Sequence, residues 1–153
     1  MDLILWRHAD ARDPREGEPD DERPLTAKGE RQAKRMAQWL NHHLPDSTRV
    51  LCSPTLRTRQ TAQALDRKFK LVPTLGPDQT VDALLTAARW PDAREPVLVV
   101  GHQFTLGLTA AYLLAGATQP WVVRKGAIWW LRRRQREAGD DVVLHMVVSP
   151  DQI

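Results

Sequence analysis

The chain has 153 residues, with 22 Lys or Arg and 19 Asp or Glu, which gives a formal net charge of +3. This length suits one hydrophobic core, and we expect residues 1–153 to form a single domain. The near balance of charges argues against nucleic acid as a partner. It still allows a locally positive pocket for an anionic group.

The chain has one cysteine, Cys52, so no internal disulfide can form, which fits a reducing compartment. The apolar run at residues 3–6 is too short for a signal peptide, and no run approaches the length of a membrane span. We therefore expect a cytoplasmic protein that does not bind membranes, and we expect a monomer.

The first half of the chain alternates short apolar runs with helical patterns. Residues 3–6 predict a buried strand, and the charged, proline-rich stretch 11–24 predicts a surface loop. Thr26 is a suitable N-cap for an amphipathic helix over residues 27–44. A second strand is expected at residues 49–52.

Ser53-Pro54 has the pattern of an N-cap followed by the first helical residue, which predicts a second helix from there to about Lys68. A brief strand is expected at residues 71–72. Thr80 begins a short helix over residues 81–88, where apolar residues recur on one face. The continuous apolar run 97–100 predicts a fully buried strand.

A largely apolar helix is expected over residues 105–115, ended by Gly116. Residues 127–132 and 142–148 predict an antiparallel hairpin. Strands that alternate with helices predict an α/β fold: a three-layer α/β/α sandwich with a mostly parallel central sheet and an antiparallel C-terminal edge.

Polar residues that can bind and transfer a phosphoryl group follow three of the expected parallel strands. Arg7 and His8 end the first, Ser53 and Arg57 follow the second, and His102 follows the fourth. Carboxyl ends of parallel strands meet at one edge of a sheet, so these side chains can converge. Arginine forks match phosphate oxygens, and a neutral imidazole can attack phosphorus without a metal or cofactor.

Four sequence motifs then resemble one known family. They are Arg7-His8-Ala9-Asp10-Ala11, Arg23-Pro-Leu-Thr-x-x-Gly29, Ser53-Pro-x-x-Arg57-x-x-Gln60-Thr61-Ala62, and Gly101-His102 after an apolar strand. Their order and spacing over about residues 3–115 are similar to the histidine phosphatase superfamily, which has the phosphoglycerate mutase-like fold. The short length and the first two motifs resemble most closely its small SixA-type phosphohistidine phosphatases.

The resemblance implies a role for each matching residue. His8 would be the nucleophile that accepts the phosphoryl group, and Arg7, Arg57 and His102 would bind its oxygens, with His102 also a proton donor. Ser53 and Arg23 are further candidates for substrate binding. Arg23 has an equally good alternative role, which is to anchor its loop against the acidic residues 20–22.

The sequence departs from the family pattern at two places. Ala9 stands where the family usually has glycine, so backbone strain would follow if that turn required a positive φ. The glutamate that larger members use as general acid is also missing from residues 72–79. Asp78 is the nearest carboxylate, and Asp10 and Asp82 are other candidates for proton donor.

A missing acid bears on the substrate, because an alkoxide leaving group needs a proton from a positioned acid and imidazole needs less help. We therefore expect a metal-independent phosphatase that works through phosphohistidine on His8. Its expected partner is a protein carrying phosphohistidine. The alternatives are a phosphatase for small phosphoesters, such as a sugar phosphate or nucleotide, and a non-catalytic phosphate-binding module.

Two other patterns have ordinary interpretations. Only four residues stand between Cys52 and Arg57, where a cysteine-phosphatase loop has five, so Cys52 is expected to be a buried strand residue. The arginines at 132–134 beside Trp129 and Trp130 are expected to belong to a solvated hairpin rather than a nucleic-acid surface. One of these tryptophans is a candidate for a protein-docking surface near the site.

Overall fold

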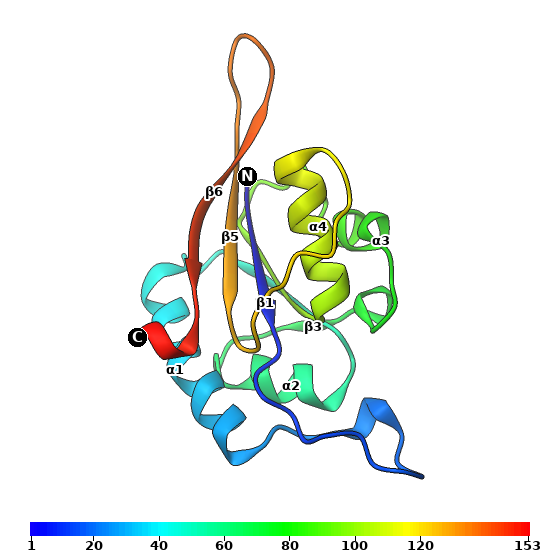
Figure 1. The fold of residues 1–153 in the computed structure, drawn as a ribbon. Coiled ribbons are helices and arrows are strands. Elements are labelled where there is room, and N and C mark those ends of the chain that lie inside the picture. The colour runs from blue at the N-terminus through cyan, green and yellow to red at the C-terminus, as the bar shows by residue number, and fades with distance from the viewer.

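The computed structural model describes residues 1–153 and contains one six-stranded sheet (Figure 1). The strand order is β3-β2-β4-β1-β5-β6. The strands β1 to β4 are parallel, and β5 and β6 form the antiparallel edge. The strand bounds are β1 Asp2–Arg7, β2 Arg49–Cys52, β3 Lys70–Leu71, β4 Val97–Gly101, β5 Ile128–Arg134 and β6 Asp141–Val148.

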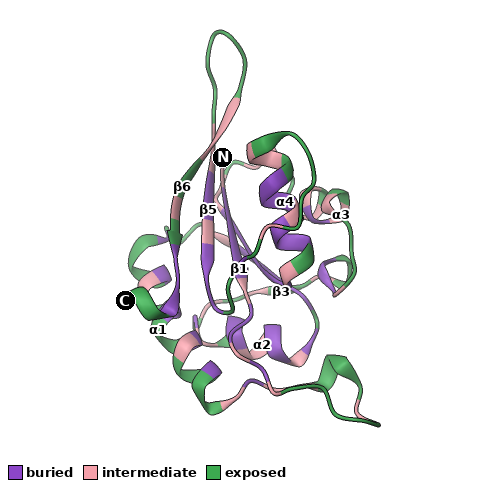
Figure 2. Ribbon diagram, in the orientation of Figure 1, coloured by how far each residue is buried: buried purple, intermediate pink, exposed green.

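Helices cover both faces of this sheet, which confirms the predicted three-layer α/β/α sandwich. One core lies under α1 (Ala27–His43) and α2 (Leu56–Gln63). It also includes Leu65, which follows α2. The other lies under α3 (Val81–Ala87) and α4 (Gln103–Ala115). In β4, Leu98 and Val100 face the first core and Val97 and Val99 the second, so the strand is buried on both sides (Figure 2).

Several predicted helix boundaries are confirmed by their caps. The Thr26 side chain accepts a hydrogen bond from Gly29 N at the start of α1, and Thr80 accepts one from Ala83 N at the start of α3. Gly116 has φ +79° in the left-handed region and ends α4. These local signals are reliable because each cap satisfies a backbone group that the helix itself leaves unpaired.

The predicted start and end of α2 are wrong. Thr55, not Ser53, caps this helix, which begins at Leu56 and ends at Gln63 rather than near Lys68. The Ser53 hydroxyl is instead 2.8 Å from a histidine nitrogen of the site, so it is not used as a cap. Beyond Gln63 the chain turns at Asp66, which has φ +53°. The brief strand is also one residue earlier than predicted, at Lys70–Leu71.

The C-terminal hairpin is longer than predicted, because β5 continues to Arg134 and β6 begins at Asp141. Its exposed tip projects beyond the rest of the sheet in Figures 1 and 2. Trp130 is buried in the first core, so it is not available as a docking residue, and half-buried Trp129 packs against Trp121. No helix is long and apolar enough to cross a membrane.

Candidate active site

His8 lies just beyond the last residue of β1, at the carboxyl edge of the parallel strands. Its Nδ1 is 2.7 Å from the Ala9 carbonyl oxygen, which can only accept a hydrogen bond. The proton of the neutral ring is therefore on Nδ1, and the lone pair is on Nε2. His8 exposes only 7% of its surface, so the free nitrogen belongs to a nearly buried ring.

The surroundings keep His8 in its neutral form. Burial lowers the pKa of His8 from 6.5 to about 4, and the positive charges of Arg57 and Arg7 act in the same direction, against the hydrogen bond to Ala9. A neutral imidazole is the form that can attack phosphorus. His8 is therefore a neutral imidazole at neutral pH.

Two arginines, one buried and one partly buried, act on this ring through their charges. Arg7 is the last residue of β1, and its Nη1 donates to the Val123 carbonyl at 2.9 Å. Arg57 lies in the first turn of α2 and exposes 3% of its surface. The Nε atoms of both are buried and have no hydrogen-bond partner within the protein. Buried donors without a partner cost free energy unless something binds them, and the oxygens of a tetrahedral oxyanion can accept from such donors.

His102 is the N-cap residue of α4, and its ring centroid is 5.6 Å from that of His8. The Ser53 hydroxyl lies 2.8 Å from His102 Nε2 and fixes the plane of the ring. Burial lowers the pKa of His102 to about 3, with further lowering by the charges of His8 and Arg57. His102 is thus a second neutral ring, held by Ser53 close to that of His8.

Polar side chains of α1 and α2 hold this arrangement in place, and two of them, Gln60 and Thr61, belong to a sequence motif in which they were given no role. Thr61 Oγ1, on α2, accepts from Ala9 N at 3.1 Å, and Gln60 Oε1 accepts from Leu25 N at 2.8 Å. Gln32, on α1, accepts from Asp10 N at 2.9 Å. Helices α1 and α2 therefore fix the backbone that follows His8.

Gly29 explains why the start of α1 can lie so close to the site. A Cβ atom on Gly29 would collide with the carbonyl oxygen of Asp10, which itself accepts from Thr26 N at 3.0 Å. Only glycine permits this approach of the helix to the loop after His8. Ala9, by contrast, is absent from the residues with positive φ, so alanine causes no such strain there.

The loop between Ala11 and Leu25 returns to the site. Arg23 Nε donates to Asp20 Oδ1 at 2.9 Å, which fits its predicted role as an anchor of the loop. Asp20 also accepts two bonds from Arg57, at its backbone oxygen and at Oδ2. Sequence reasoning noticed Asp20 only as a partner for Arg23 and missed its contact with Arg57.

The carboxylates predicted as proton donors are not brought to the two histidines. Asp10 bonds to the Thr26 hydroxyl at 2.7 Å and to Lys125 at 3.2 Å. Asp78 is exposed, has φ +64° and makes no side-chain hydrogen bond or ion pair. Asp82 lies in the first turn of α3. No group of three or more His, Cys, Asp or Glu side chains is arranged to hold a metal ion.

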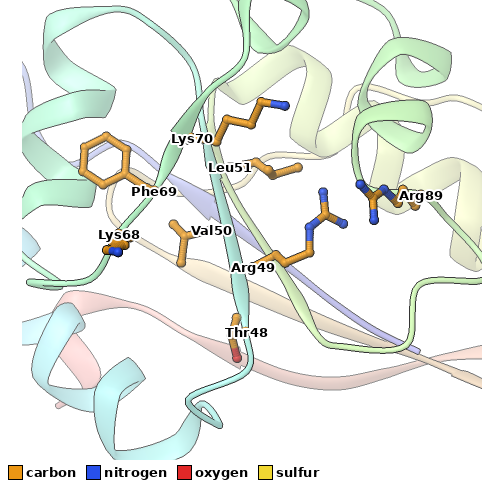
Figure 3. A pocket seen from close by; sticks show the side chains of 8 residues that line it. All are labelled: Thr48, Arg49, Val50, Leu51, Lys68, Phe69, Lys70 and Arg89. Carbon is orange, nitrogen blue, oxygen red and sulfur yellow. The ribbon is translucent and has the colours of Figure 1, made fainter.

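A cavity of about 380 Å³ lies elsewhere, at the amino end of β2 and the edge strand β3 (Figure 3). Its cationic lining residues are Arg49, Lys68, Lys70 and Arg89. None of the residues around His8 lines it. Cys52, at the other end of β2, is fully buried, and burial raises the pKa of its thiol to about 12, which leaves it an inert core residue.

The fold and this site together are typical of enzymes that transfer or hydrolyse phosphoryl groups. The family model of the histidine phosphatase superfamily (branch 1) matches residues 3–79. The chain belongs to this superfamily, and it is a phosphatase.

Individual relatives agree with this assignment. The chain is 31% identical over 128 residues to the phosphohistidine phosphatase SixA of Escherichia coli, covering 78% of each chain. It is 34% identical over 162 residues to an uncharacterized protein of Picosynechococcus, covering 98% of this chain and 97% of the relative. A structure of the protein histidine phosphatase SixA complexed with tungstate has 28% identity and a TM-score of 0.77, with 99% of both chains covered.

Proposed function

We propose that this protein hydrolyses phosphohistidine on a partner protein, through a covalent phosphohistidine intermediate on His8. The observation that carries the proposal is the hydrogen bond from His8 Nδ1 to the Ala9 carbonyl, at 2.7 Å. It leaves Nε2 with a free lone pair, and Arg7 and Arg57, whose charges act on this ring, each have a buried Nε without a partner in the protein. A related SixA structure holds tungstate, which is a tetrahedral oxyanion like the phosphoryl group.

In the first step, His8 Nε2 forms a bond to phosphorus while the bond to the leaving group breaks, and its electron pair returns to the leaving nitrogen. The Nδ1 proton stays on His8, bonded to Ala9 O, so the phosphorylated ring is a cation. Arg7 and Arg57 offset the charge on the phosphoryl oxygens in place of a metal ion. His102, held by Ser53, donates to one of these oxygens.

In the second step, water attacks phosphorus, and the electron pair of the P–N bond returns to His8 Nε2. The transferred group and the water together leave as dihydrogen phosphate, so atoms and charges balance. The ring is restored to its starting tautomer. No side chain has to store a proton between the two steps.

Phosphohistidine is favoured over a phosphoester because of the leaving group. Neither Asp10 nor Asp78 bonds to the two histidines or the two arginines, so neither is placed to protonate an alkoxide. Imidazole can leave without such an acid when its other nitrogen is already protonated. The named SixA relatives act on phosphohistidine, which supports the same substrate class here.

A substrate panel at neutral pH tests this proposal. We expect a phosphohistidine peptide to have a higher kcat/KM than a sugar phosphate or a nucleotide under the same conditions. Faster turnover of one of these phosphoesters would contradict the proposal and make that phosphoester the preferred substrate. Turnover of none of them would favour a phosphate-binding module over an enzyme.

A further inference from the structure

Asp20 is the one carboxylate that hydrogen-bonds to either arginine beside His8. Arg57 Nη1 donates to the Asp20 backbone oxygen at 2.8 Å, and Nη2 donates to Oδ2 at 3.0 Å. Arg23 holds Oδ1 at 2.9 Å. The Asp20 side chain nevertheless exposes 52% of its surface, whereas that of Arg57 exposes 4%. Asp20 is therefore a half-exposed carboxylate that two arginines hold in place beside the site.

These contacts do not block the phosphoryl site. A guanidinium can donate from two edges, and Asp20 takes the edge formed by Nη1 and Nη2. Arg57 Nε remains buried and without a partner in the protein, so the other edge stays available for phosphoryl oxygens. Asp20 thus lies next to a bound phosphoryl group rather than in its place.

The carboxylate is also ionised at neutral pH. Burial alone would raise the pKa of Asp20, but the hydrogen bond from Arg23 and the charges of Arg57 and Arg23 outweigh this and lower it. An ionised carboxylate cannot protonate a leaving group. It can accept a hydrogen bond from a cation that enters the pocket.

We propose that Asp20 recognises the protonated imidazole of a phosphohistidine substrate, by accepting a hydrogen bond from the ring nitrogen that does not carry phosphorus. This inference rests on the proposed function and names the residue that selects its substrate. The leaving group must point away from His8 towards solvent, and Asp20 is the half-exposed carboxylate bonded to the phosphoryl-binding Arg57.

The contact has a chemical consequence. When His8 Nε2 bonds to phosphorus, the electron pair of the broken P–N bond returns to the substrate ring. The proton on the other ring nitrogen stays there, bonded to Asp20, and the imidazolium leaves as neutral imidazole. Asp20 stabilises the cationic form in which the P–N bond is weak, and no general acid takes part.

The test compares Asp20→Asn with the wild type on phosphoimidazole and on p-nitrophenyl phosphate. Nitrophenolate has no N–H to offer, so any loosening of Arg57 affects both substrates and cancels in the ratio of their kcat/KM values. We expect that ratio to fall about 10- to 100-fold, the range expected for losing one hydrogen bond to a charged group. Glu22 is an exposed acid in the same 3-10 turn as Asp20 (Asp20–Glu22). The substitution Glu22→Gln should leave the ratio unchanged.

An unchanged ratio in Asp20→Asn would overturn the inference and leave the proposed function intact, because Asp20 would then only position Arg57. A wild-type enzyme that hydrolyses p-nitrophenyl phosphate but neither phosphoimidazole nor a phosphohistidine peptide would overturn both. Thermal unfolding of each variant, with a midpoint within a few degrees of the wild type, shows that the comparison is made on folded protein.

Discussion

The two ends of the parallel sheet both carry cations, yet only one end has the groups for catalysis. At the carboxyl ends, the charges of buried Arg57 and partly buried Arg7 act on two neutral histidines. At the amino end of β2, Arg49 and its neighbours line the cavity of Figure 3, and Arg49 lies 3.7 Å from Glu95. Positive charge and a cavity alone therefore do not define the proposed active site, which we assign instead to the end where arginines and two neutral histidines come together.

Removing the nucleophile should have the largest effect on this comparison. His8→Ala should lower kcat for a phosphohistidine peptide at least about 10³-fold, because the other buried imidazole of the site, His102, has its Nε2 in contact with Ser53. Single-turnover assays measure the loss. Arg49→Ala, at the other end of the sheet, is the matched control and should retain wild-type kcat. Comparable losses in both variants would contradict the assignment.

Exchanging arginine for lysine should also affect the two ends of the sheet differently, and this is the second largest expected effect on activity. Arg57→Lys keeps the charge but removes the Nε edge and both bonds to Asp20, so kcat/KM should fall about 10²-fold. Arg49→Lys should change kcat/KM less than about two-fold, because an ion pair far from the site contributes little. Steady-state kinetics with one substrate decide this. If lysine were tolerated equally at both positions, bidentate binding by Arg57 would be wrong.

Acid should destabilise the carboxyl end of the sheet. The folded protein holds His8 with a pKa of about 4, against 6.5 when unfolded, so the unfolded chain binds the extra proton as pH falls. Stability is full above pH 6.5 and should fall by about 3 kcal/mol towards pH 4 from this group, with His102 acting in the same direction. Urea unfolding at several pH values measures this, and His8→Asn should flatten the slope. An equal slope in that variant would assign the loss to other groups.

The close approach at Gly29 should have a smaller effect. Gly29→Ala puts a Cβ onto the Asp10 carbonyl and should cost about 2 kcal/mol, as other overpacked sites do. Gln38→Ala, on the exposed face of α1, should change stability by less than about 0.5 kcal/mol. Denaturant midpoints give both values. If the alanine were accepted at no cost, Gly29 would have no structural need to be glycine.

The elements that were predicted well are those with local signals. Thr26, Thr80 and Gly116 each satisfy a backbone group at a helix end, and the alternating cores of β4 follow from its continuous apolar run. The start of α2 was predicted wrongly, because Ser53 bonds to His102, which is 49 residues away in sequence. A distant partner of this kind leaves no local pattern.

The same distinction applies to the site. His8, Arg7, Arg57 and His102 were found because they follow predicted parallel strands, whose ends must meet. Asp20 was not found as a pocket residue, because it lies in a loop whose path depends on the ion pairs it makes with Arg23 and Arg57. Asp78 was proposed only because it is the nearest carboxylate in sequence to the missing glutamate. The chain turns at Asp78, and its side chain is exposed to solvent.

Trapping the phosphorylated enzyme tests the central claim most directly. The wild type is mixed with a ³²P-labelled phosphohistidine peptide, quenched in alkali within milliseconds, and mapped by mass spectrometry. Up to one phosphoryl group per chain should be found on His8, labile in acid and stable in base, and none in His8→Ala. Normal turnover with no labelled enzyme, or with the label on another residue, would contradict covalent catalysis by His8.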